Sequence, residues 1–129
     1  MPLRVLVVED SSAMRTYLRT ALEDGGFSEV TEAANGFEAL RLLPRERYDV
    51  VVTDINMPDI HGLELLSFMR KSEAHARTPV VIVSTEGALR DRERGMALGA
   101  NAYLTKPFQP EEVREALRRV LESALEKKT

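Results

Sequence analysis

Residues 5–10 read VLVVED, a β-branched apolar run that ends in the acids Glu9 and Asp10. Two later runs follow the same plan: VVVTD at 50–54 ends in Asp54, and NAYLTKPF at 101–108 carries Lys106 after its apolar residues. Short runs of this kind are typical of buried parallel strands, whose carboxyl ends lie along one edge of a sheet. Because α/β proteins bind ligands at that edge, we expect the three acids and the lysine to share a pocket.

Strand and helix patterns alternate along the whole chain. The predicted strands cover residues 3–8, 29–33, 48–54, 79–84 and 101–105, and the predicted helices cover 11–26, 36–43, 63–71, 88–98 and 110–128. Strands that alternate with helices imply right-handed βαβ crossovers and a sheet with helices on both faces. The sequence therefore predicts a single α/β domain over residues 1–129, built on a five-stranded, doubly wound parallel sheet.

The predicted helix at 88–98 is the least well specified of the five. Leu89 and Met96 are its main large apolar residues, and Gly95 lies in its interior. Glycine at such a position costs about 1 kcal/mol relative to alanine. We therefore expect a weakly anchored helix whose position can shift.

Composition excludes several classes of protein. The net charge of −3, with 30% charged residues of both signs, provides no basic field for direct contact with nucleic acid. The chain has no cysteine, so it forms no disulfide and performs no thiolate chemistry. No apolar run approaches the roughly 20 residues of a membrane span, and the first residues lack a signal-peptide layout. A cytoplasmic protein without membrane insertion is the expectation.

The acids at the strand ends are candidate metal ligands. Burial would raise the pKa of Asp54 unless a cation compensates, and Mg²⁺ prefers oxygen ligands such as one or two carboxylates. We expect Asp10 and Asp54 to bind Mg²⁺ directly, Glu9 to bind it through water, and Asn56 to lend its backbone carbonyl. The alternatives are ordinary ones: Asp54 as a turn or helix-capping residue, and Asp10 as the cap of the helix at 11–26.

Lys106 and Ser84 follow the fifth and fourth predicted strands and suit a bound phosphoryl group. An ammonium can contact a phosphoryl oxygen as a point charge, and a serine hydroxyl can donate to it, with Thr85 as the backup hydroxyl. The Lys106-Pro107 pair also permits a cis peptide bond, which would aim the lysine into the pocket. A solvated lysine and an ordinary loop serine are the alternatives.

In this order and spacing, these residues resemble a two-component response-regulator receiver domain. The motif extends from Asp54-Ile-Asn-Met-Pro58 to Gly62, and the resemblance covers essentially the whole chain. It implies the flavodoxin-like (CheY-like) three-layer (βα)5 fold. The segments Asp-Ser-Ser-x-Met-Arg at 10–15 and GANAYLTKPF at 99–108 are further similar to stand-alone chemotaxis regulators of the CheY type. Thr85 departs from the small alanine usual in the family.

The resemblance implies a signalling role. Asp54 would accept a phosphoryl group from a phosphohistidine on a sensor histidine kinase, in a reaction that the receiver performs and reverses on itself rather than as a turnover enzyme. Ser84 and Tyr103 would act as switch residues. The face made by residues 88–98, 101–105 and 110–128 would then be read by a downstream target protein. A monomer or a weak, phosphorylation-linked dimer is the expected state.

Three other interpretations remain open at the level of sequence. A pseudo-receiver would serve only as a docking module, but it would lack one of the acids, the lysine or the switch hydroxyl. An aspartate-nucleophile phosphatase would place a second aspartate where this chain has Asn56. A receiver can also be part of a longer transcriptional regulator, although the polar ending at 126–129 favours a natural terminus.

Overall fold

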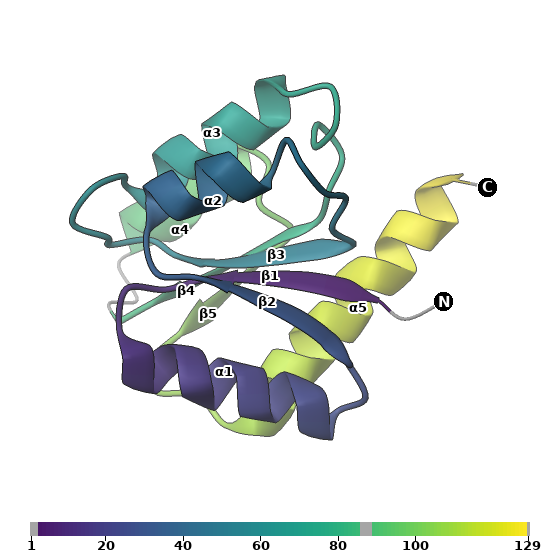
Figure 1. The fold of residues 1–129 in the computed structure, drawn as a ribbon. Coiled ribbons are helices and arrows are strands. Elements are labelled where there is room, and N and C mark those ends of the chain that lie inside the picture. The colour runs from purple at the N-terminus through teal and green to yellow at the C-terminus, as the bar shows by residue number, and fades with distance from the viewer. Residues whose placement is uncertain (1–2, 86–88, 129) are drawn as a thin grey trace.

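A parallel sheet of five strands, in the order β2-β1-β3-β4-β5, forms the centre of the molecule (Figure 1). The computed structural model describes residues 3–85 and 89–128. The elements are, in chain order, β1 (Arg4–Val8), α1 (Ser12–Asp24), β2 (Glu29–Ala33), α2 (Gly36–Leu42), β3 (Val50–Asp54), α3 (Gly62–Lys71), β4 (Val80–Ser84), α4 (Leu89–Ala97), β5 (Ala102–Thr105) and α5 (Pro110–Lys128). The predicted doubly wound α/β fold is confirmed.

Helices cover both faces of the sheet, with α1 and α5 on one side and α2, α3 and α4 on the other (Figure 1). Each face has its own apolar core. One is built around Leu18, Leu22 and Leu117 of α1 and α5, and the other around Leu65 and Leu66 of α3. All residues of β3 and β4 are buried, as continuous apolar strands in the interior of a parallel sheet require.

The ends of α1 differ slightly from the prediction of a helix over 11–26. Ser11 is the N-cap, because its side chain accepts a hydrogen bond from the amide of Met14, and helical residues begin at Ser12. The helix ends at Asp24, and Gly26 then adopts a φ of 94°, which glycine reaches without steric cost.

The described part of α4 agrees with the expectation that large apolar side chains anchor this helix weakly. Met96 is 44% exposed and is therefore not a core anchor, and the side chain of Leu89 lies outside the described part of the structure. Among the α4 residues whose burial the structure describes, Gly95 is the buried one: a Cβ atom added to it would lie 3.0 Å from Cδ1 of Ile82 and 3.9 Å from Cδ2 of Tyr103. The glycine allows α4 to approach the sheet closely.

The segment that follows Asp54 folds back tightly before α3 begins. The amide of Gly62 donates to the carbonyl of Ile55 at 2.8 Å. A Cβ atom on Gly62 would lie 2.3 Å from the Asp54 carbonyl oxygen and 2.7 Å from Cα of Ile55. The start of α3 therefore packs directly on the main chain of Asp54, and only glycine fits there.

Within the residues that the structure describes, every helix is too short or too polar to span a lipid bilayer.

Replacing Gly62 by alanine is predicted to lower the free energy of unfolding by about 2 kcal/mol, since the added methyl group meets backbone atoms that have no room to move. Gly95→Ala is the matched control. Its methyl group meets the mobile end of the Ile82 side chain, and the gain in helix propensity, about 1 kcal/mol, offsets the crowding. Urea unfolding of the two variants and the wild type measures the difference; equal losses would contradict the close-approach argument.

Candidate functional site

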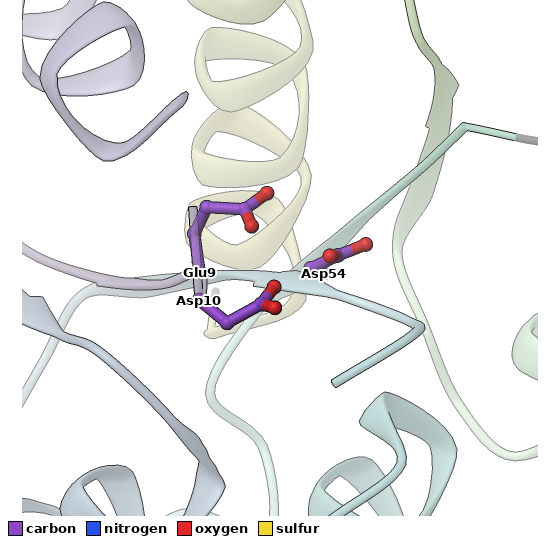
Figure 2. Close-up of side chains that lie close together, drawn as sticks. All are labelled: Glu9, Asp10 and Asp54. Carbon is purple, nitrogen blue, oxygen red and sulfur yellow. The ribbon is translucent and has the colours of Figure 1, made fainter. Parts of the chain in front are cut away.

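Three carboxylates gather at the carboxyl ends of β1 and β3. Glu9, Asp10 and Asp54 each offer an oxygen within 4.8 Å of the others, and their carboxylates project to the same side of the strand ends (Figure 2). Glu9 is 1% exposed and Asp54 is 6% exposed, whereas Asp10 lies at the surface. The structure thus brings the predicted acids together in a cluster that is open to solvent on the Asp10 side.

Sheet register and local hydrogen bonds place these acids. Val8 of β1 pairs with Thr53 of β3, so the next residues of the two chain segments, Glu9 after β1 and Asp54 at the end of β3, lie side by side. The Glu9 amide donates to the carbonyl of Ala33 at 3.1 Å, and the Glu9 carboxylate accepts from the amide of Ser11 at 3.0 Å. Because Ser11 caps α1, the alternative role of Asp10 as the helix cap is wrong.

Asp54 also takes part in a local turn. Its carboxylate accepts a hydrogen bond from the Asn56 amide at 3.4 Å, and Asn56 itself lies exposed beside the cluster. The Asp54 side chain therefore has both predicted roles: it accepts a hydrogen bond within a turn, and it belongs to the acid cluster. This hydrogen bond helps to fix the orientation of the Asp54 carboxylate.

Lys106 supplies positive charge from the end of β5. Its Nζ lies 2.6 Å from Oε1 of Glu9 and 3.7 Å from Oδ2 of Asp54, and the lysine side chain is only 11% exposed. The Lys106–Pro107 peptide bond is cis, and the Lys106 amide donates to the carbonyl of Ser84 at 2.6 Å. Glu9 is therefore chiefly the partner of the lysine in this arrangement.

The cluster carries more negative charge than its lysine neutralises. Burial raises the pKa of Glu9 above its ordinary value, although the hydrogen bond from Lys106 acts in the opposite direction. Burial also raises the pKa of Asp54, against the attraction of Lys106, and the negative charge of Asp10 adds to the rise. A bound cation would relieve this repulsion. Hard carboxylate oxygens at this spacing fit Mg²⁺.

The other predicted residues lie around the acids. Ser84 is fully buried at the end of β4, one residue beyond Val83, which pairs with Asp54 across the sheet. Thr85 follows it at the surface. Tyr103 of β5 is half-buried and packs against the core on the α3 and α4 side of the sheet. These positions put the hydroxyl candidates on the strand next to Asp54 and the aromatic candidate beside α4.

Sequence reasoning assigned no role to Arg15, which the structure places against the acid turn. Its Nη1 donates to the carbonyl of Glu9 at 2.8 Å. A signal was present in the spacing, because side chains of a helix lean toward its N-terminus. A long side chain at the fourth residue of a helix therefore reaches back over the loop that precedes it.

Comparison with known proteins agrees with this geometry. Residues 5–118 match the family model of the response regulator receiver domain. A chemotaxis protein CheY homolog of Campylobacter jejuni subsp. jejuni is 38% identical over 120 residues, which make up 92% of either chain. The probable transcriptional regulator ycf29 of Porphyra purpurea is 37% identical over 113 residues, which are 88% of this chain and 54% of the relative.

Solved structures show the same fold. The chemotaxis response regulator CheY4 of Vibrio cholerae has a TM-score of 0.87 at 37% identity, over 93% of this chain and 99% of that one. The receiver domain of a sensor histidine kinase from Pseudomonas aeruginosa PAO1, solved with a magnesium ion coordinated in its active site cleft, has a TM-score of 0.86 at 30% identity, over 95% and 99% of the two chains. The chain belongs to the response regulator receiver domain family of two-component systems and has a CheY-like fold.

Proposed function

We propose that this chain is a phosphoacceptor switch in which Asp54 accepts a phosphoryl group from a phosphohistidine of a sensor kinase, with Mg²⁺ as cofactor. The observation that carries the proposal is the position of Asp54, which is buried next to the Glu9–Asp10 acid pair and 3.7 Å from Lys106. The chain acts on its own aspartate and is restored by hydrolysis, so it is not a turnover enzyme. Asp10, Asp54 and the Asn56 carbonyl would hold the metal directly, and Glu9 would bind it through water.

The transfer step follows from these positions. An Asp54 carboxylate oxygen attacks phosphorus in line, the phosphorus–nitrogen bond of the phosphohistidine breaks, and the electron pair stays on the histidine nitrogen. An acyl phosphate results. When bound, Mg²⁺ would neutralise part of the negative charge on the phosphoryl oxygens. Lys106, 3.7 Å from Asp54, offsets further negative charge on the same oxygens.

The switch would arise from new contacts to the phosphoryl group. Its oxygens would accept hydrogen bonds from Ser84 and Lys106, and the lysine would exchange part of its contact with Glu9 for this partner. Movement at the end of β4 would reach Tyr103 of β5 and the helix α4, which lie next to each other. The change is a shift in population toward the state with better phosphoryl contacts. A downstream protein would read the α4–β5–α5 face.

The CheY homologues favour a stand-alone regulator of the chemotaxis type, because they match this chain over nearly their full length. The relationship to ycf29 keeps the longer transcriptional regulator as the second candidate, since only about half of that protein corresponds to this chain. A cytoplasmic location and a monomeric or weakly dimeric state remain predictions from the sequence.

Asp54→Asn is predicted to abolish labelling of the protein by radiolabelled acetyl phosphate, because the amide is not a nucleophile toward phosphorus. Asp24→Asn, which makes the same change at the exposed end of α1, is the matched control and retains wild-type labelling. Undiminished labelling of the Asp54 variant would place the acceptor elsewhere and refute the proposal. A wild-type protein that remains unlabelled by any phosphodonor would favour a docking module.

Mg²⁺ is predicted to raise the free energy of unfolding at neutral pH, and this increment shrinks as the pH falls into the acidic range where the carboxyl groups become protonated. The sign follows from the raised pKa values of Glu9 and Asp54. Lowering the pH through these values protonates the folded carboxyls, which stabilises the metal-free protein but removes the ligands of the metal. Urea unfolding with and without Mg²⁺ at each pH measures both effects.

Asp10→Asn tests the metal assignment directly, because it removes one charge from the exposed side of the cluster. The variant is expected to lose most of the Mg²⁺ increment in stability, while Asp24→Asn keeps it. An unchanged increment in the Asp10 variant would remove this residue from the set of metal ligands.

A further inference from the structure

Arg15 of α1 links three parts of the molecule that meet at the acid cluster. Its Nη1 lies 2.8 Å from the carbonyl oxygen of Glu9 and 3.4 Å from that of Asp10. Its Nε lies 3.3 Å from Oε1 of Glu32 on β2. The Arg15 side chain is only 18% exposed, so these contacts are partly shielded from solvent. The residue therefore spans from β2 to the turn that carries both acids.

A second arginine keeps Glu32 in place from the next turn of the same helix. Arg19 pairs through Nη1 with Oε2 of Glu32 and donates from Nη2 to the carbonyl of Val30 at 2.9 Å. It also pairs with Glu23 of its own helix. The contacts of Arg19 thus go to β2 and α1, whereas Arg15 extends from the same glutamate to the acid turn.

The Glu9–Asp10 turn depends on such contacts for its position. The Glu9 amide is held by the carbonyl of Ala33, and the Glu9 carboxylate by Lys106 and the amide of Ser11. Arg15 holds the two carbonyl groups of the turn. The exposed carboxylate of Asp10 is placed by this main chain, so a turn without Arg15 would leave that ligand less well oriented.

We propose that Arg15 is a positioning residue of the acid pair, which sets the affinity of the site for Mg²⁺ and its preference for Mg²⁺ over larger divalent ions. The inference rests on the proposed function, because it takes the acids to be metal ligands. Mg²⁺ demands nearly ideal octahedral geometry at short distances, whereas Ca²⁺ accepts longer and more irregular coordination. A less well oriented Asp10 carboxylate therefore weakens the binding of Mg²⁺ more than the binding of Ca²⁺.

The sign of the effect separates positioning from simple electrostatics. Arg15 is a cation close to the site, so its charge alone would oppose the binding of another cation. If charge were its whole influence, removing it would tighten the binding of Mg²⁺ and Ca²⁺ alike. If it orients the ligands, removing it weakens Mg²⁺ binding in spite of the favourable change in charge.

Arg15→Met and Arg19→Met form a matched pair. Each removes one positive charge from α1 and leaves Glu32 with one arginine, but only the first removes a contact to the acid turn. Calorimetric titration with Mg²⁺ and with Ca²⁺ is expected to show a fall of about tenfold in the Mg²⁺ affinity of Arg15→Met, the size typical of residues that support metal ligands. The Ca²⁺ affinity falls less, and Arg19→Met stays within about twofold of the wild type for both ions.

The outcomes distinguish this inference from the proposed function. One outcome overturns the positioning role and leaves the proposed function intact. In it, the wild type binds Mg²⁺, and the Mg²⁺ affinity of Arg15→Met equals that of Arg19→Met or exceeds that of the wild type. A wild type that binds no Mg²⁺ overturns both. Circular dichroism checks that the variants fold. If Arg15→Met does not fold, Arg15→Lys replaces it. The compact ammonium of lysine cannot contact Glu32 and the Glu9 carbonyl at the same time. The positioning role then requires the same loss of preference for Mg²⁺ over Ca²⁺ in Arg15→Lys.

Discussion

Buried negative charge at the carboxyl edge of the sheet is the constraint on which the site depends. Glu9 and Asp54 are almost fully buried, and Lys106 contacts both. Burial raises the pKa of each acid in spite of that lysine. The folded chain therefore contains buried negative charge that is only partly neutralised, which is unfavourable for stability. A divalent cation, alone or together with a phosphoryl group, would offset this charge. The receiver fold stabilises this arrangement through its two apolar cores.

The scaffold fixes the acids through contacts to their main chain as well as to their side chains. β1 and β3 are neighbours in register, so Glu9 and Asp54 emerge side by side. The start of α3 packs on the Asp54 carbonyl through Gly62, and Arg15 holds the carbonyls of the other acid turn. Strands and tight turns thus bring the acids and the lysine together, and the phosphoryl transfer proposed above would rely on this preorganisation.

Much of this could be predicted from the sequence, because the signals are local. The apolar runs of β3 and β4 and the polar residues at their ends identify a parallel sheet and its functional edge. What escaped prediction depends on three-dimensional contacts. In the sequence Gly95 only weakens a helix, yet α4 meets the sheet through this residue. Asp10 and Ser11 are both good caps in isolation, and only the geometry of the turn selects Ser11. The place of Arg15 early in its helix indicates that it leans toward the preceding loop, but its contact with the Glu9 carbonyl is seen only in the structure.

The hydrogen bond from the Lys106 amide to the Ser84 carbonyl has a mechanical consequence. Ser84 ends β4 and Lys106 follows β5, the neighbouring strand, so this hydrogen bond joins the main chains of the two proposed switch residues. Because of this hydrogen bond, a shift of either strand end would move the other strand end with it. Ser84 and Lys106 would therefore respond together and not independently. Substitutions of the Ser84 and Lys106 side chains leave this main-chain hydrogen bond in place, so non-additive energies between them would report a group that both side chains contact.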